Sequence, residues 1–172
     1  MKKKTGGISN LILRYLILIL VAIPNLWLFY LIFTPLTAYP VYWLLGIFYD
    51  ASLLNNDVIL INQISIELIE ACIAGSAYYL LLILNLSTPG IKARKRMKML
   101  FLAFASFLIV NIMRIFILSL VAVSGSSFFD ITHRIFWYAL STIFVVAIWF
   151  SEVKTFKIKA IPIYSDIKFL YK

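Results

Sequence analysis

The stretch MLFLAFASFLIVNIMRIFILSLVAV, residues 99–123, decides the fold, because Arg114 is the only charged residue in an otherwise apolar run. At about 1.5 Å per helical residue the run exceeds the roughly 30 Å hydrocarbon core of a bilayer, which predicts a membrane-spanning helix. A guanidinium inside such a helix costs at least about 2.5–3.5 kcal/mol on insertion scales. We therefore expect Arg114 either to pair with a buried acid or with carbonyls, or to act as a functional cation facing a bundle interior.

The composition of the whole chain is typical of a multi-pass membrane protein. Hydrophobic residues make up 63% of the sequence, charged residues 13%, and the mean hydropathy is +1.00. The net charge is +9, but the Lys and Arg residues gather at 2–4, at 92–98 and after 153, each cluster beside an apolar run. This positive-inside pattern predicts cytoplasmic clusters that touch anionic lipid headgroups, and it argues against nucleic acid as a partner.

These patterns predict an all-α integral membrane protein with four transmembrane helices in a single membrane domain, 1–172. We expect a cell-membrane protein with both termini in the cytoplasm and an uncleaved first span. The expected parts are spans at 11–33, 69–86, 99–123 and 131–150, a short interfacial or re-entrant helix at 41–50, a small outer β-hairpin-like segment at 51–68, and a cytoplasmic tail at 151–172.

Three chemically distinctive residues fall at one expected depth on three different spans. Counted from the cytoplasmic edge at 1.5 Å per residue, Cys72 lies about 22 Å up, Arg114 about 24 Å and His133 about 27 Å. Each also has a structural explanation: a lone Cys as a small hydrophobe, a polar helix start at His133, and an Arg satisfied by a neighbour. The coincidence in depth favours a shared site in the outer leaflet.

The chemistry that these three residues support is nucleophilic catalysis. A thiol needs a nearby base or cation to react, and His133 can take its proton and later deliver it to a leaving amine. Arg114 can stabilise the oxyanion of a tetrahedral intermediate or the thiolate. One Cys and one His are too few ligands for a metal site, one cysteine excludes an intrachain disulfide, and no phosphate-binding or nucleic-acid motif is present, so we expect no cofactor.

Three further residues are candidates for supporting roles. Asn111 lies three residues before Arg114, on the same helix face, where it could satisfy the guanidinium. Glu70 could orient His133 or pair with Arg114 or Arg134, although a solvated helix N-terminus is the commoner explanation for such a carboxylate.

At these residues the chain resembles the exosortase/archaeosortase family of membrane-embedded cysteine transpeptidases. The resemblance covers about residues 40–150 and rests on Glu70-Ala-Cys72, on Asn111-Ile-Met-Arg114-Ile115 and on His133. The small size and the Ile/Lys-rich composition are similar to those of compact archaeosortase-like members, such as the pacearchaeosortase type. The chain departs from the family's Cys-Ser-Gly or Cys-Thr-Gly, since Cys72-Ile-Ala-Gly75 displaces the glycine and lacks the hydroxyl.

The resemblance implies a function. Exported proteins that carry a C-terminal motif, a transmembrane segment and a basic tail would be cleaved outside the membrane by Cys72, through a thioester. His133 would act as acid and base and Arg114 as the electrostatic partner, and a lipid or cell-surface acceptor would resolve the thioester. Two alternatives stay open: a plain intramembrane cysteine protease, and a non-catalytic membrane scaffold or transporter subunit in which Arg114 forms a buried ion pair.

Overall fold

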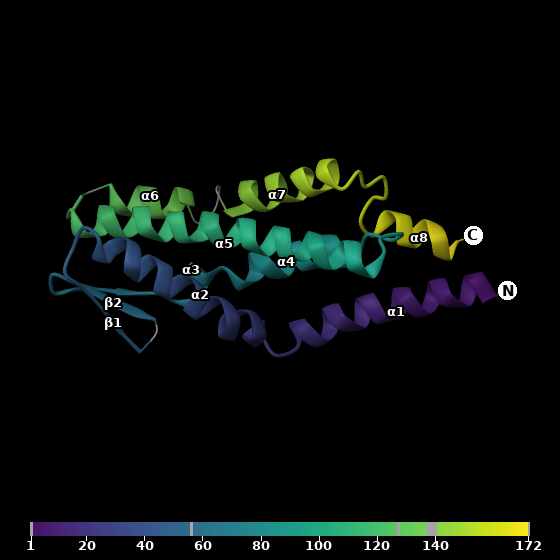
Figure 1. Cartoon of the computed structure of the whole chain (residues 1–172), viewed down its shortest axis with the longest axis horizontal. Coiled ribbons are helices and arrows are strands. Elements are labelled where there is room, and N and C mark those ends of the chain that lie inside the picture. The colour runs from purple at the N-terminus through teal and green to yellow at the C-terminus, as the bar shows by residue number, and fades with distance from the viewer. Residues whose placement is uncertain (1, 56, 127, 137–140, 172) are drawn as a thin grey trace.

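The computed structural model describes residues 2–55, 57–126, 128–136 and 141–171, and shows an elongated helical molecule with a small sheet at one end (Figure 1). The described ends of the chain lie together at the other end. The elements in chain order are α1 (Lys2–Ala22), α2 (Trp27–Gly46), β1 (Ala51–Leu54), β2 (Val58–Ile61), β3 (Ile64–Glu67), α3 (Glu70–Ile73), α4 (Gly75–Leu86), α5 (Ala93–Val123), α6 (Phe129–Ile135), α7 (Ser141–Thr155) and α8 (Tyr164–Leu170).

Helix α5 is the axis of the fold, because α2, α4, α6 and α7 all pack against it. Its buried residues recur every three or four positions, which places them on one face of the helix. Arg114, 8% exposed, and Asn111, 1% exposed, belong to that buried face. The complete set is Arg96, Met99, Ala103, Phe107, Asn111, Arg114, Ile115 and Ser119.

The prediction of four spans is wrong. Among the described residues, two helices are long and apolar enough to cross a membrane, Trp27–Gly46 and Ala93–Val123. The expected span at 99–123 lies inside the second of these, which begins earlier and includes the basic residues after position 92.

The apolar run at 11–33 is divided because the chain turns just after Pro24. Asn25 and Leu26 have positive φ values of 50° and 60°, so α1 ends before them and α2 begins after them. Helix α2 then continues through Pro35 and Pro40, and residues 41–46 of the expected separate helix at 41–50 form its last turns. A buried face repeating every four residues anchors α2 against α5 and α4, and this packing outweighs the two lost amide donors.

The expected span at 69–86 is also interrupted. Within 69–86, Ala74 adopts a left-handed conformation with φ of 60°, which separates the short α3 from the 12-residue α4. Neither is long enough to cross about 30 Å of hydrocarbon at 1.5 Å per residue. Within 131–150, the structure describes α6 and α7, and residues 137–140 between them lie outside the described residues.

The class is not all-α, since the segment expected as an outer hairpin at 51–68 forms a three-stranded antiparallel sheet in the order β1-β2-β3. Asn62 and Gln63 join β2 to β3 in a two-residue turn, with φ of 48° and 74°. Positive φ at both central residues suits the tight turn that matches strand twist. A second turn and a third strand were not evident from the partial alternation of the sequence.

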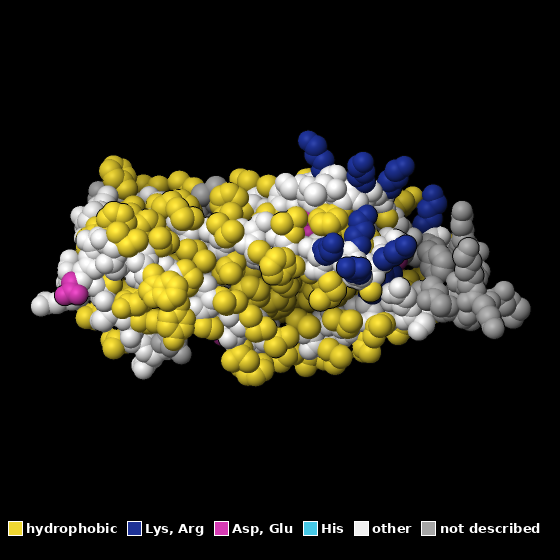
Figure 2. Space-filling model, viewed as in Figure 1, with side chains coloured by type: hydrophobic (Ala, Val, Ile, Leu, Met, Phe, Trp, Pro, Cys, Tyr) yellow, Lys and Arg dark blue, Asp and Glu magenta, His cyan; other side chains and the backbone are white. Residues whose placement is uncertain are grey.

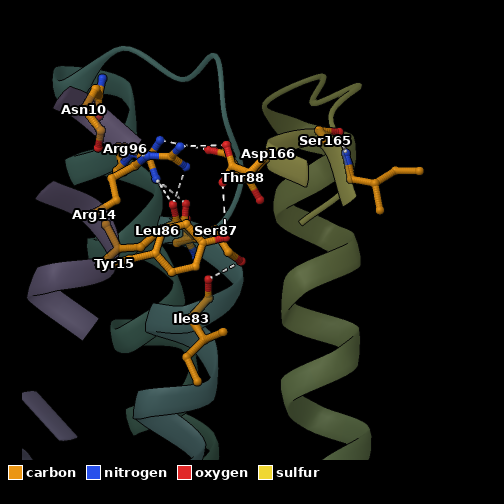
Figure 3. Close-up of polar contacts among 12 residues, drawn as sticks. Asn10, Arg14, Tyr15, Ile83, Leu86, Ser87, Thr88, Arg96, Ser165 and Asp166 are labelled. Atoms are coloured by element: carbon orange, nitrogen blue, oxygen red, sulfur yellow. Dashed lines mark hydrogen bonds and ion pairs between the residues drawn. The ribbon is translucent and has the colours of Figure 1, made fainter. Parts of the chain in front are cut away.

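At the opposite end, the tail beyond residue 151 folds back onto α1 and α4. The Asp166 carboxylate on α8 accepts a hydrogen bond of 2.7 Å from the Arg14 guanidinium, and both side chains are less than 10% exposed (Figure 3). Arg14 also donates to the Leu86 carbonyl at 2.7 Å, and Arg96 donates to the carbonyls of Asn85, Leu86 and Thr88. The two guanidinium groups thus satisfy carbonyls at the end of α4, which have no partner within that helix.

The charged side chains are distributed unevenly along the long axis of the molecule. Figure 2 shows Lys and Arg gathered toward the end where α7, α8 and the start of α5 lie, an acidic side chain at the sheet end, and an apolar surface between them. The described helices thus expose an apolar middle and a basic end.

Candidate functional site

The candidate site is built on the break between α3 and α4. Because Ala74 leaves the helical conformation, the carbonyls of residues 71–73 are released from the regular pattern of helical hydrogen bonding. Cys72 lies in this short turn and is half-buried, with its backbone amide donating to the Ile69 carbonyl at 2.8 Å. The interruption therefore holds the thiol in a short, externally supported turn.

Two side chains of α5 supply that support. The Asn111 amide donates to the carbonyls of Cys72 at 3.0 Å and Ile73 at 3.4 Å. The Arg114 guanidinium donates to the carbonyls of Cys72 at 3.1 Å and Ala71 at 3.5 Å. Since the two lie three residues apart on one buried face, α5 fixes the position of the Cys72 backbone.

Of the two structural roles foreseen for Arg114, the pairing with carbonyls is therefore the one these contacts display. Asn111 was expected to satisfy the guanidinium, but its side-chain oxygen has no hydrogen-bond partner among the described residues, and both side chains instead donate to the Cys72 carbonyl. Hydrogen bonds from a charged donor are about twice as strong as neutral ones. The guanidinium is thereby held next to the thiol whatever its further role.

Cys72, Arg114 and His133 line one cavity of about 300 Å³. They come from α3, α5 and α6, three elements that are far apart in the sequence. The His133 ring lies parallel to that of Phe129, with 5.7 Å between ring centroids and 4° between the planes. This stacking restricts the imidazole to one side of α6.

Glu70 and Arg134 lie elsewhere. Glu70 lines a second cavity of about 580 Å³ on the other side of α3, together with Tyr30, Ser76 and again Arg114. Arg134 is exposed and is not among the described residues that line either cavity. This arrangement therefore does not favour the predicted contact of Glu70 with His133. It favours the predicted pairing of Glu70 with Arg114, because both line the second cavity.

The displaced glycine of the Cys72–Gly75 segment has a packing role. A Cβ atom at Gly75 would lie 2.7 Å from the Tyr30 ring, closer than such atoms approach in proteins. The positive φ is taken by Ala74 instead. Glycine thus allows the close approach of the Tyr30 ring of α2 at this position.

Three polar residues of the first cavity were not among the predicted site residues. Ser65 and Glu67, both on β3, and Ser119, on the buried face of α5, line it. Ser119 is 2% exposed, and its hydroxyl has no hydrogen-bond partner among the described residues. Its spacing of five from Arg114 gave no helical signal, and the sheet that brings Glu67 alongside was not foreseen.

No group of three His, Cys, Asp or Glu side chains in the described part of the chain is arranged to hold a metal ion. No protein-family model matches the chain, and neither does a curated protein or a solved structure. We therefore argue function from the geometry of the two cavities and the residues that line them.

Proposed function

We propose that the chain is a membrane-embedded cysteine transpeptidase or protease, with Cys72 as nucleophile. The observation that carries this proposal is the convergence of Cys72, Arg114 and His133 on one cavity. A thiol, an imidazole and a guanidinium in a shared, partly enclosed space are the groups that acyl transfer requires.

In the first step the Cys72 thiol gives its proton to the imidazole of His133, and the sulfur attacks the carbonyl carbon of a peptide bond. The carbonyl oxygen becomes negatively charged in the tetrahedral intermediate, and the neighbouring Arg114 guanidinium stabilises it. The carbon–nitrogen bond then breaks, His133 returns the proton to the leaving amine, and a thioester on Cys72 remains.

In the second step an amine or hydroxyl acceptor attacks the thioester and gives its proton to His133. The carbon–sulfur bond breaks, and the sulfur recovers a proton from the imidazole. An acceptor on a lipid or a cell-surface component gives a transferred product, whereas water gives plain hydrolysis.

The proposed site faces the outer side of the cell membrane. The basic end of the molecule carries both described chain ends and belongs in the cytoplasm by the positive-inside pattern. The cavity is lined by β3 and α6, which lie at the opposite end. An exported protein held by a C-terminal transmembrane segment and basic tail would present its cleavage site at that height, as the exosortase/archaeosortase resemblance implies.

A non-catalytic membrane scaffold or transporter subunit is the competing function. The hydrogen bonds from Arg114 and Asn111 to the α3 carbonyls favour it, because they give both residues a purely structural use. Under this alternative the thiol would be replaceable.

The deciding experiment compares host cells carrying the wild-type chain or Cys72→Ala, using mass spectrometry of the C-termini of membrane proteins. We expect one or more exported proteins to lose a C-terminal segment only with the wild-type chain, and to retain it in Cys72→Ala. The mass added to the new C-terminus distinguishes a transferred acceptor from hydrolysis. Identical C-termini in both strains, with both proteins present in the membrane, would favour the scaffold.

A further inference from the structure

Strand β3 forms one edge of the sheet, beside the proposed catalytic cavity. Within the described chain it pairs with β2 on one side and with no strand on the other. An unpaired edge presents a row of backbone N–H and C=O groups to which another extended segment can bind. The direction of those groups follows from the register.

The register assigns the outward groups to Ser65 and Glu67. The amide of Leu68 donates to the Asp57 carbonyl at 2.7 Å, so this pair is a hydrogen-bonded one. Directly opposed residues of an antiparallel pair alternate between bonded and non-bonded. Two steps along each strand, Ile66 with Ile59 and Ile64 with Ile61 therefore bond to each other. Ser65 and Glu67 lie between them, and their N–H and C=O groups point away from β2.

The cavity runs along this edge. Successive strand side chains point to opposite faces of a sheet, so a cavity on one face would be lined by alternate residues. Here the lining residues are consecutive, from 64 to 69, and the lining continues to Cys72. Consecutive lining residues place the edge itself, with its outward backbone groups, on the cavity wall.

The opposite wall belongs to α5 and is mostly apolar. Ile115, Leu118 and Ala122 line it at helical spacing. Arg114 and Ser119 are its polar residues, and the buried hydroxyl of Ser119 has no hydrogen-bond partner among the described residues. A hydroxyl in that position on a helix commonly bonds to the carbonyl one turn earlier, so its unsatisfied state points to a ligand in the cavity.

We propose that the substrate polypeptide binds as an added strand on β3, extended between the sheet edge and α5, with its scissile bond at Cys72. The inference rests on the proposed function, since only a cysteine peptidase or transpeptidase needs a peptide bond at this thiol. The backbone of Ser65 and Glu67 gives affinity for any extended chain, and the apolar wall selects apolar side chains at alternate positions. Ser119 supplies a hydrogen bond to the substrate backbone.

Proline at position 65 tests the edge. Ser65→Pro removes an outward N–H without removing a hydrogen bond to β2, and proline is tolerated at such edge positions. The matched control is Ala51→Pro on β1, where the same alternation points the N–H to the opposite edge of the sheet. We expect Ser65→Pro to lower substrate processing at least tenfold and Ala51→Pro to leave it within twofold, with equal thermal unfolding of the two variants in detergent.

Ser119→Ala provides a second measurement that does not alter the sheet. It removes a hydroxyl without a described partner, so stability should be unchanged or higher. Processing should nevertheless fall severalfold, while Ser106→Ala on the same helix should have no effect.

The outcomes separate the inference from the function beneath it. If Cys72→Ala abolishes processing but Ser65→Pro and Ser119→Ala process normally, the added-strand binding mode is wrong and the cysteine mechanism stands. If Cys72→Ala also processes normally, the proposed function itself is wrong. A Ser65→Pro variant that processes normally but changes oligomeric state would assign the edge to self-association and overturn the inference.

Discussion

Buried arginines donate to helix-end carbonyls at both ends of the molecule, but they lie beside different chemical groups. At the basic end, Arg14 and Arg96 donate to carbonyls that finish α4, and Asp166 neutralises Arg14 beside a cavity of about 330 Å³. At the sheet end, Arg114 donates to carbonyls that finish α3, and the cavity that it lines also contains a thiol and an imidazole. Arginine supports a helix end in both places. The proposed catalytic role of Arg114 follows from the thiol and the imidazole beside it.

Changing one arginine at each end to lysine tests whether the two ends differ in function. Lysine keeps the charge and loses the planar fork that binds two acceptors at once. We expect Arg114→Lys to lower processing about 100-fold, in the range found when an oxyanion donor is removed. Arg96→Lys should leave processing per folded molecule unchanged and cost about 1–3 kcal/mol of stability, because buried carbonyls lose their donor. Equal processing in both variants would make Arg114 a structural cap only.

Loss of the Arg14–Asp166 ion pair should lower stability strongly without changing activity. Asp166→Asn leaves the Arg14 guanidinium buried without its counter-ion, which typically costs about 3–5 kcal/mol. Thermal unfolding in detergent measures this loss, with exposed Asp130→Asn as the control that should change little. A lower unfolding temperature in Asp130→Asn than in Asp166→Asn would contradict the assignment.

A pH dependence at the basic end follows from Glu152. Burial raises the pKa of this carboxyl from 4.5 to about 7, and the hydrogen bond from Asn85 opposes the shift. Below pH 4.5 the group is protonated in both states, so it imposes no penalty on folding. As pH rises toward 7 the unfolded chain ionises while the folded chain keeps its proton, so stability falls, and the full loss is present above pH 7.

At about 1.4 kcal/mol per pKa unit, the loss amounts to at most about 3–4 kcal/mol. Unfolding temperatures at pH 5 and pH 8 should therefore differ in the wild type, with the lower value at pH 8, and the difference should shrink in Glu152→Gln. The same slope in wild type and variant would mean that another group titrates.

The smallest expected effect concerns the spacing of α2 and α4 behind the site. Gly75→Ala would push a methyl group against the Tyr30 ring and should cost about 1–3 kcal/mol, nearer the lower value because a ring can shift. In the double variant with Tyr30→Leu the cost should largely disappear, which a double-mutant cycle measures. Additive effects in that cycle would show that the two residues do not meet.

The sequence predicted the central helix more successfully than it predicted the other spans. Residues 99–123 could be recognised because a long apolar run with one buried charge has few structural solutions. The breaks after Pro24 and at Ala74 could not, because the left-handed residues there are Asn25, Leu26 and Ala74, of which only an asparagine commonly adopts that conformation. The continuation of α2 through two prolines depends on packing against distant helices, which local patterns do not contain.

For the site, too, the sequence contained only part of the information. Depth along the chain placed Cys72, Arg114 and His133 at one level, although the expected span that carries Cys72 is interrupted at Ala74. Which side chains share a cavity depends on helix rotation, so depth alone could not separate Glu70, on the second cavity, from His133, on the first. The α3 carbonyls that Arg114 contacts exist only because of a break that the sequence did not reveal.

The most direct test of a catalytic thiol at the sheet end uses Cys72 as the only cysteine of the chain, so alkylation reports on it alone. We propose to measure the rate of iodoacetamide modification at pH 7.5 in detergent, in wild type, His133→Ala and the exposed neighbour Arg134→Ala. We expect a rate at least tenfold lower in His133→Ala and unchanged in Arg134→Ala, because the imidazole accepts the thiol proton. Equal rates in all three folded proteins would contradict it.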